Sequence, residues 1–468
     1  MRRGLAGIGL VAVLLAGCSF TPKYVRPVGA APSQWPTGAA YGPPQAGAAG
    51  LPWRRVVGSG KFQQVIARAL ENNRDLRASL ANVDAARAQY RAQKSRQLPT
   101  LTASASASQQ NYEGSRSPSG LATGGFPLDS YSASIGVSAF EVDLFGRLRS
   151  QSQQAFEQYL ATASGLRAAR LTIVAETADA YLTLASDRDL LAVANDTAAS
   201  ADKTLALTQS LLGAGLGNAA DVENARTVLA QARSDVENYT TLVAQDRNAL
   251  ELLVGAQVED DLLPTSLFDL DGTIARPPAG LSSEVLRDRP DVLEAEHQLK
   301  AAYAGVGAAR AEFFPTFSLT ASGGLASTAL SSFLTSGALN VARSASASVP
   351  VLGGQAKADL EAARAEQASA LAAYDKAVQG AFRDVANALA RDGTIGRQRS
   401  AQRDLTASAD HSLKLSEAQY RAGVQPFLAT LTAQRTAYAA RQNEIRTVLE
   451  DLRNRVSLYE AIGADPTL

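Results

Sequence analysis

Hydrophobic and polar residues alternate with a period of two in both halves of the chain. Residues 101–108 read Leu-Thr-Ala-Ser-Ala-Ser-Ala-Ser, and a second alternating stretch covers 131–139 after a Gly-, Pro- and Ser-rich segment. The arrangement recurs at 316–321 and 341–351. This is the period of a β-strand, whose side chains point to opposite faces in turn. The β-hairpins predicted in this way span about 100–143 and about 316–351.

The segments after the hairpins repeat their apolar residues every three or four positions, as α-helices do. No proline, which would break a helix, occurs between Pro127 and Pro264. A helix from Leu144 to about Leu211 would be about 100 Å long at ~1.5 Å per residue. Glycines then mark a turn and the end of a return helix. The predicted helix pairs span 144–255 and 352–463, with turns at Gly213, Gly215 and Gly217 and at Gly423.

An internal repeat relates the two halves of the chain. The Leu-Pro-Thr-Leu motif that ends at Leu101 aligns with the Phe-Pro-Thr-Phe motif that ends at Phe317, at an offset of 216 residues. From about 144 to 255 the offset is 208. Each half also has a shorter helix, at about 76–97 and about 291–312, which ends before a proline. The predicted fold class is α+β, mainly α, with a two-fold repeat of long helical hairpins and β-hairpins.

The N-terminus has the composition of an export signal. Arg2 and Arg3 precede an apolar run that ends in Leu-Ala-Gly-Cys18, which contains the single cysteine of the chain. The run is too short to span a bilayer as a stable helix. Leu-Ala-Gly-Cys resembles a bacterial lipobox, in which a peptidase cleaves before a cysteine that receives lipid. Residues 1–17 would then be a lipoprotein signal peptide, and Ser19 would direct the protein to the outer membrane. The alternative is an ordinary secretory signal with a chance cysteine.

Charge and composition disfavour several functional classes. Lys plus Arg and Asp plus Glu both number 45, so the net charge is zero and no nucleic-acid partner is expected. The two histidines, His297 and His411, are far apart, and neither metal-ligand spacing nor a Ser/His/Asp or Cys/His set stands out. We therefore expect no enzyme, no metal and no cofactor other than a covalent lipid on Cys18.

The predicted strands suggest how the chain meets a membrane. No stretch after residue 17 has the apolar length of a transmembrane helix, so any crossing would use β-strands. Two hairpins provide about four strands, too few to close a barrel, which would need strands from several chains. Alternating apolar and Ser/Thr residues suit a wall between lipid and water. Arg343 interrupts the last apolar row, and the sequence leaves open whether it faces lumen or lipid.

Several motifs resemble the signatures of TolC-type outer membrane factors, in particular the lipidated NodT/OprM-like branch. They are the segment 141–149, the Arg-Pro-Asp-Val motif at 289–292, the Phe-Phe-Pro motif at 313–315 and the segment 18–27. The resemblance implies a homotrimer in which four strands per protomer close a twelve-stranded outer-membrane β-barrel, continuous with a periplasmic α-helical barrel. It implies a protein of the cell outer membrane that is lipid-anchored and extends into the periplasm.

The resemblance also implies a function and a set of partners. The chain would be the passive exit duct of a tripartite efflux system that exports small molecules such as drugs. Besides other copies of itself, it would bind a periplasmic adaptor, an inner-membrane pump of the RND type and outer-membrane lipid. The implied organisation is a lipid-anchored and equatorial segment at 18–60, repeat 1 at 61–255, an equatorial linker at 256–285, repeat 2 at 286–463 and a tail at 464–468.

A periplasmic gate is implied at the turns between the long helices. In the family a tip tyrosine and an aspartate link the two helix pairs, and Tyr420 and Asp221 match these positions. Gln425 occupies the position of an Arg that assists in some members, a role that Arg421 can take in part. From the residues alone, a solvated helix tip is the more common interpretation of each of these positions.

Three further positions belong to the implied constriction. Leu428 matches an apolar ring of the family. The family's acidic rings fall at Ala429 and Thr432 and are therefore missing in this chain. The adaptor would contact the tips at Gly215, Gly217, Gly423 and Val424.

Two other functions remain open at the level of the sequence. The same fold could serve as the outer membrane component of a type I protein-secretion system. A poreless periplasmic coiled-coil lipoprotein is a third alternative, although a scaffold would not need the two alternating hairpins.

Overall fold

The computed structural model describes residues 20–27, 30–42, 52–112, 126–276, 282–334 and 339–468. The chain forms two compact units, and each unit combines segments of both repeats. Unit 1 comprises 1–26, 83–162 and 295–373, and unit 2 comprises 27–82, 163–294 and 374–468. The two repeats are therefore interleaved in space and do not form one compact unit each.

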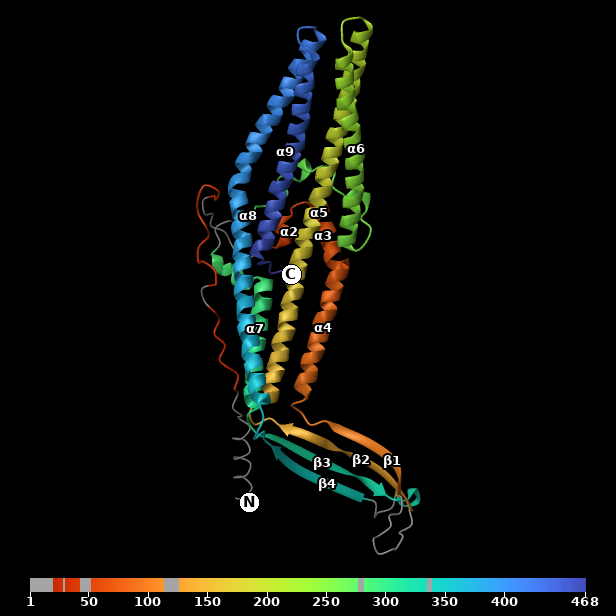
Figure 1. The fold of residues 1–468 in the computed structure, drawn as a ribbon, viewed down its shortest axis with the longest axis vertical. Coiled ribbons are helices and arrows are strands. Elements are labelled where there is room, and N and C mark those ends of the chain that lie inside the picture. The colour runs from red at the N-terminus through yellow and green to blue at the C-terminus, as the bar shows by residue number, and fades with distance from the viewer. Residues whose placement is uncertain (1–19, 28–29, 43–51, 113–125, 277–281, 335–338) are drawn as a thin grey trace. The chain divides into compact units, whose positions relative to one another are not determined.

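Unit 1 contains a four-stranded antiparallel sheet (Figure 1). The strands are β1 (Leu101–Tyr112), β2 (Phe126–Val142), β3 (Thr316–Ser327) and β4 (Leu339–Ser348). Their order in the sheet is β1-β2-β3-β4, so β2 of the first repeat pairs with β3 of the second. All four strands lie within the two hairpin ranges predicted from the alternating pattern.

One face of the sheet is apolar and the other carries serine and threonine, because directly paired residues share a face. Along one row, Leu101 pairs with Val137, Val137 with Ala321 and Ala321 with Arg343. Arg343 therefore lies on the apolar face of the sheet. The sequence alone had left the face of Arg343 open. On the other face, serine hydroxyls of β1 and β2 are hydrogen-bonded across the strand pair.

A β-bulge in β2 changes which residues reach the apolar face. The pairing with β3 shifts between Val137 and Phe140, and Ala139 has a φ of 52°. Because the bulge adds a residue to β2, Phe140 lies opposite Leu319, on the apolar side. The simple alternation predicted for 131–139 was therefore wrong at its end. A bulge reverses the face to which the following residues of a strand point, and the amino-acid composition does not indicate where it occurs.

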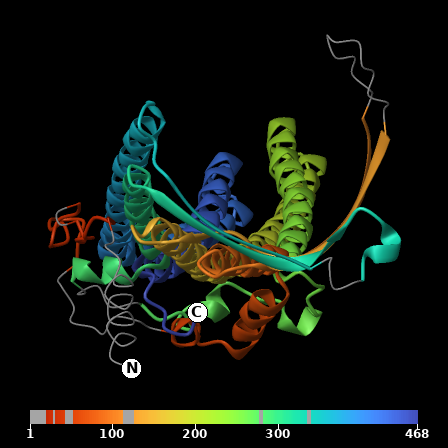
Figure 2. The ribbon, with the colours of Figure 1, turned by 90° about the horizontal axis from the view of Figure 1, so that it is seen from below.

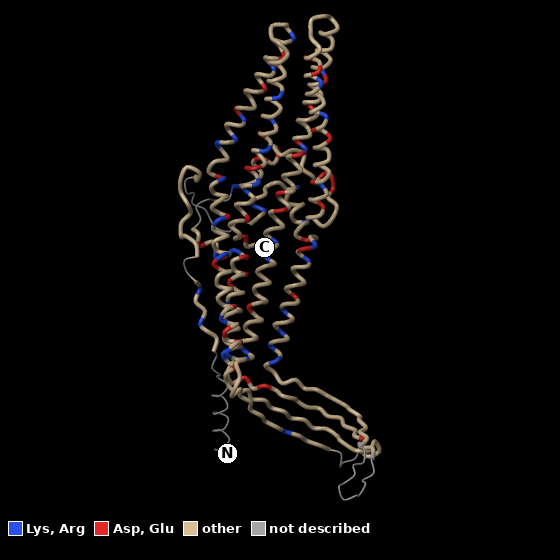
Figure 3. Tube along the Cα trace, in the orientation of Figure 1, with Lys and Arg blue, Asp and Glu red and all other residues tan. Residues whose placement is uncertain are grey.

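The sheet is curved and nearly uncharged. Figure 2 shows the strands following one curved surface. Figure 3 shows that charged residues are frequent on the helices and rare on the strands, where they are Asp129, Glu141 and Arg343. The Ser/Thr face is the crowded one, since a Cβ at Gly136 would lie 2.6 Å from the Cβ of Ser322.

Long helices make up most of the rest of the chain. Those that contribute to both units are α4 (Arg74–Ser95), α5 (Arg147–Gly213), α7 (Pro290–Ala311) and α8 (Gln355–Arg421). Unit 2 adds α2 (Trp53–Val56), α3 (Gly60–Asn72), α6 (Ala219–Val254), α9 (Phe427–Ile462) and the short helices η1 (Asp260–Leu262), η2 (Phe268–Leu270) and η3 (Ser283–Asp288). In unit 1, η4 covers Leu330–Ser332. Among the described residues, none of the helices combines the length and apolar character needed to cross a bilayer.

Backbone geometry confirms the internal repeat. Helices α5 and α8 both have 67 residues, and α6 and α9 both have 36. Gly255 and Gly463, which are 208 positions apart, end α6 and α9 in the left-handed conformation, with φ of 72° and 66°. A Cβ at Gly255 would lie 2.6 Å from the backbone oxygen of Asn72, so both the backbone angle and the space favour glycine there.

The main core of unit 2 lies where α3 packs against α5, α6 and α9. The Phe62 ring is fully buried and stacks on Tyr181, with ring centroids 4.2 Å apart. The Tyr181 hydroxyl donates to the carbonyl of Leu262, 2.9 Å away, and so ties the segment after α6 to α5. Large apolar and aromatic side chains thus concentrate at one level of the helices, where several elements meet.

A buried ionic network fixes the same segment to α9. The Asp451 carboxylate is fully buried and accepts from Arg455, 2.7 Å away, and from Arg399 of α8. Arg455 also donates to the carbonyl of Ile274, 2.8 Å away. Each charge of this network therefore has a partner, as burial requires.

Candidate functional site

Two of the motifs that resemble outer membrane factors, 141–149 and 313–315, meet the N-terminal segment in unit 1, whereas the motif at 289–292 lies in unit 2. Phe314 stacks on Phe20 and on Phe145, with centroid distances of 4.6 and 4.8 Å. Arg310 donates to the Phe20 carbonyl at 3.2 Å and so fixes the N-terminal segment to α7. Cys18, the predicted lipidation site, lies outside the described residues. These aromatic residues therefore pack together where strands give way to helices.

The two turns between long helices, 214–218 and 422–426, are built alike; we call them the helical tips. Gly215 and Gly423 have φ of 74° and 72°, which is the left-handed region that glycine adopts freely. The Leu216 N–H donates to Leu211 O at 2.9 Å, and the Val424 N–H donates to Gln419 O at 3.0 Å. These equivalent bonds close each helix with the same turn.

Each tip exposes one large apolar side chain. Leu216 is 78% exposed and Val424 is 77% exposed. Val424 was predicted as an adaptor contact, whereas Leu216 was missed, although the offset of 208 relates the two positions. The predicted contacts Gly215, Gly217 and Gly423 all lie in the same two turns.

Tyr420 and Asp221 lie close enough to interact electrostatically. Burial, together with the charge of Asp221, raises the pKa of Tyr420. In the part of the chain that the structure describes, however, no hydrogen bond joins the two side chains. The Asp221 carboxylate instead accepts from Asn218 Nδ2 at 2.9 Å, and the Asn218 side chain caps α6 by accepting from the Asp221 N–H. The gate role of this pair stays a prediction.

An apolar cluster holds the helices together next to the tips. The Tyr420 ring packs on Phe427, with centroids 5.3 Å apart, and Phe427 is almost fully buried. The cluster joins α5, α6 and α9, and its buried members are Ala201, Ala225, Val228, Leu229, Phe427 and Leu431. Tyr420 therefore contributes to the tips through its ring.

The other predicted gate residues lie on α8, α9 and the turn between them. Arg421 pairs with Glu417 of its own helix at 3.2 Å, and Gln425 is half-buried. Leu428 is 64% exposed, and its carbonyl accepts from the Thr432 hydroxyl at 2.9 Å. Leu428, Ala429 and Thr432 together line a groove of about 440 Å³ between α8 and α9. These side chains are thus gathered on one hairpin.

A second groove of unit 2 has an acidic lining. It measures about 490 Å³ and is lined by Glu176, Asp179, Asp246, Glu460 and Arg453 among others. Burial, with the charge of the neighbouring Asp187, raises the pKa of Asp246 to about 7. The lining shows no grouping of three metal-binding side chains, and none occurs elsewhere in the described residues.

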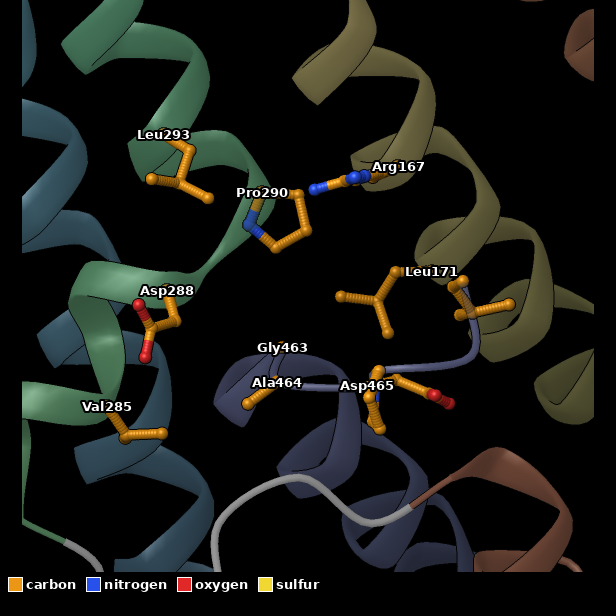
Figure 4. Close-up of a pocket in the computed structure, with 11 residues that line it drawn as sticks. Arg167, Leu171, Val285, Asp288, Pro290, Leu293, Gly463, Ala464 and Asp465 are labelled. Carbon is orange, nitrogen blue, oxygen red and sulfur yellow. The ribbon is translucent and has the colours of Figure 1, made fainter.

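A pocket of about 420 Å³ lies between the start of α7 and the C-terminal tail (Figure 4). Figure 4 shows Pro290 at its rim, with Arg167 and Leu171 on α5 and Asp465 on the tail. Its lining is mainly apolar, and no predicted gate residue belongs to it. It is a packing gap beside the Arg-Pro-Asp motif, in which Arg289 pairs with Asp291 at 2.7 Å.

Comparisons with known proteins agree with the motifs and the fold. The family described as outer membrane efflux protein matches residues 65–256 and 281–464. TtgC of Pseudomonas putida, a probable efflux pump outer membrane protein, is 38% identical over 467 residues, covering 99% of this chain and 96% of the relative. OprJ, an outer membrane protein of Pseudomonas aeruginosa, is 35% identical over 469 residues, with coverage of 99% and 96%.

A solved structure shows the same architecture. The open state of the MtrE outer membrane channel of Neisseria gonorrhoeae aligns with a TM-score of 0.83 and 32% identity, covering 96% of this chain and 99% of that one. Fold and motifs together define an outer membrane channel. The chain belongs to the outer membrane efflux protein family, as the motifs predicted. It is a protein of the cell outer membrane that extends into the periplasm, from a family of channels rather than of enzymes.

The packing of Tyr420 leads to a first prediction. Tyr420→Ala removes the ring from the cluster around Phe427 and is expected to raise the resting conductance of the channel several-fold in planar bilayers. Tyr420→Phe keeps the ring and is expected to behave as the wild type. If Tyr420→Phe alone raises conductance, the hydroxyl is the gating group, as the family resemblance implies.

The raised pKa of Asp246 leads to a second prediction. The pKa of an unfolded Asp is about 3.9, so between about pH 4 and pH 7 the folded protein binds more protons than the unfolded chain. The free energy of unfolding should therefore fall as pH rises through this window. Asp246→Asn should remove this contribution and stabilise the protein relative to wild type above pH 7. Thermal unfolding followed by circular dichroism from pH 5 to 8 measures the slope, and an unchanged slope in Asp246→Asn would contradict the assignment.

Proposed function

We propose that this chain forms the exit duct of a tripartite efflux pump, as a homotrimer whose three sheets close one twelve-stranded outer-membrane barrel and whose helical hairpins form a periplasmic tunnel. One observation carries the proposal: the sheet order β1-β2-β3-β4 places β1 and β4 at open edges. In lipid, edge N–H and C=O groups have no water to bond, so such edges must be paired. Three copies would pair each β4 with the β1 of a neighbour.

The two faces of the sheet support an orientation in this barrel. The apolar face would meet lipid, and the Ser/Thr face would line a water-filled lumen. Charges on the strands are rare, which suits a wall in contact with lipid. Arg343 lies on the apolar face, and its long side chain can extend toward the headgroup level.

The helical tips would bind a periplasmic adaptor. Leu216 and Val424 are exposed apolar side chains on turns of the same geometry, with Gly215, Gly217 and Gly423 around them. An inner-membrane pump, which we propose to be of the RND type, would supply the energy for export. Related proteins are named for antibiotic, toluene and solvent efflux, so we propose small, largely apolar molecules as the cargo.

We also propose that Cys18 carries the lipid anchor. The support is its place in the Leu-Ala-Gly-Cys motif and the fixed position of Phe20, two residues later, against Phe314 and Arg310. Radioactive palmitate should label the wild type and not Cys18→Ser. Label that persists on the variant would disprove this anchor.

The duct is tested by mass and conductance. Native mass spectrometry in mild detergent should give three copies, and the purified protein should conduct in a planar bilayer. A stable, non-conducting monomer would overturn the proposal.

A charge scan on β1 tests the orientation of the sheet. Ala105 and Ser104 are both exposed neighbours, on the apolar and on the Ser/Thr face respectively. Ala105→Arg would place a charge in lipid and cost roughly 2–4 kcal/mol near mid-bilayer, lowering the yield of folded trimer. Ser104→Arg, facing water, should fold and change the conductance. The reverse pattern would show that the faces are assigned the wrong way round.

A further inference from the structure

The apolar face of the sheet is bounded at both ends by aromatic side chains. Near the helices, Phe140 and Phe317 lie on this face in neighbouring rows. At the far end Tyr131 lies on it, and the next row is polar, with Gln109 opposite Asp129. Girdles of aromatic residues flank the apolar band of membrane barrels at both interfaces. The rows between Phe317 and Tyr131 therefore form the band that would meet lipid.

The height of this band matches that of a bilayer. Tyr131 pairs with Ser327, which lies ten residues from Phe317 along β3. At ~3.3 Å per residue this separation is about 33 Å along the strand. Because barrel strands are tilted by about 40°, it corresponds to a height of about 25 Å, the usual height of the apolar band.

Arg343 is the one charged side chain that the described strands place within this band. The other two strand charges lie outside it: Asp129 is beyond Tyr131, and Glu141, which follows the bulge, is on the Ser/Thr face opposite Ser318. The Arg343 side chain is exposed and forms no hydrogen bond or ion pair with any residue that the structure describes. A guanidinium does not lose its charge in a protein, so in lipid it needs an anionic partner or water.

Arg343 is nearer to the end of the band that adjoins the helices. It pairs with Ala321, which lies four residues from Phe317 and six from Ser327. These separations correspond to heights of about 10 Å and about 15 Å. Since the helices extend into the periplasm, the lipid headgroups nearest to Arg343 would be those of the periplasmic leaflet.

The residues beside Arg343 favour the same direction. Toward the helices the next two residues on its face of β4 are Ala345 and Ala347, whereas away from the helices they are Val341 and Leu339. Alanines leave room for a long side chain to lie along the strand, and the larger valine and leucine fill that room. The guanidinium can therefore extend toward the headgroup level on the periplasmic side.

We propose that Arg343 binds the phosphate of a phospholipid of the periplasmic leaflet, one per protomer, on the lipid-facing side of the sheet. Arginine suits this ligand because its planar guanidinium donates two parallel hydrogen bonds to phosphate oxygens. Phosphatidylglycerol is preferred, because its headgroup has no cation that competes with Arg343 for the phosphate. The inference rests on the proposed function in one respect, that the apolar face meets lipid.

Lipid binding to the purified protein tests the site. Native mass spectrometry in mild detergent, with added phosphatidylglycerol, should show up to three tightly bound lipids per trimer. Arg343→Gln removes the charge and should weaken this binding about 10-fold. Arg343→Lys keeps the charge without the bidentate geometry and should have an intermediate affinity. Equal affinity of the wild type and Arg343→Gln would overturn the site.

Matched variants separate the site from a general loss of charge and establish its direction. Arg435→Gln removes an exposed arginine from α9 and should leave lipid binding unchanged, and a loss equal to that of Arg343→Gln would overturn the site. Ala345→Leu should weaken binding because it fills the room toward the helices, whereas Val341→Leu, on the other side, should not. If only Val341→Leu weakens binding, the guanidinium extends toward the opposite leaflet and the periplasmic assignment is wrong.

Two competitors identify the source of the phosphate. Inorganic phosphate brings no acyl chains and should not displace phosphatidylglycerol, and displacement at equal concentration would show that the ligand is free phosphate. Lipid A, whose phosphates lie at the outer surface of the outer membrane, should bind the wild type and Arg343→Gln alike. Lipid A binding that depends on Arg343 would overturn the assignment to the periplasmic leaflet.

Conductance distinguishes this site from the duct. A conducting trimer that binds no phosphatidylglycerol would overturn the site and leave the proposed function intact. A non-conducting protein whose lipid binding still depends on Arg343 would overturn the duct and leave the site.

Discussion

The pairing of β2 with β3 is the interaction on which the rest of the architecture depends. Each repeat alone supplies one two-stranded hairpin, and such a hairpin is at best marginally stable in isolation. The register from Tyr131 with Ser327 to Val142 with Phe317 joins both hairpins into one sheet with continuous apolar and Ser/Thr faces. The bulge at Ala139 then keeps the apolar face continuous up to the end of the strand, because it brings Phe140 opposite Leu319 on that face.

The repeat explains what the two hairpins share, and the contacts between them explain what differs. Helix lengths, tip turns and the ion pairs within each hairpin recur at an offset of 208, because each hairpin folds against itself in the same way. Contacts between the two hairpins join positions that are not equivalent in the repeat. They therefore depend on residues that occur in only one of the two repeats. The hydrogen bond that the Tyr438 hydroxyl of α9 donates to Asp235 of α6 belongs to this second group, as does the Phe427 cluster, and both are free to change without disturbing the basic hairpin.

Much of this architecture could be predicted from the sequence, because it follows from local rules. Strand and helix periods, Pro99 and Pro315 after the short helices, and the capping glycines placed the strands and the helices shared by both repeats to within a few residues, whereas helix α3 was not predicted. Leu216 could also have been predicted as an exposed residue of a tip, because it is the repeat equivalent of Val424, at the offset of 208 residues. The bulge at Ala139, the bond between Asn218 and Asp221 and the bond between Tyr438 and Asp235 could not. Each depends on register or on packing between helices, which leaves no periodic signal in one chain.

The likeness of the two tips has a consequence for stoichiometry. A partner that recognises the turn itself, through its left-handed glycine and the apolar side chain that follows it, meets two such turns on every chain. The number of docking points is then twice the number of protomers, so a ring of partners need not match the channel one to one. Leucine at one turn and valine at the other allow the two classes of docking point to differ in affinity while their backbone geometry stays the same.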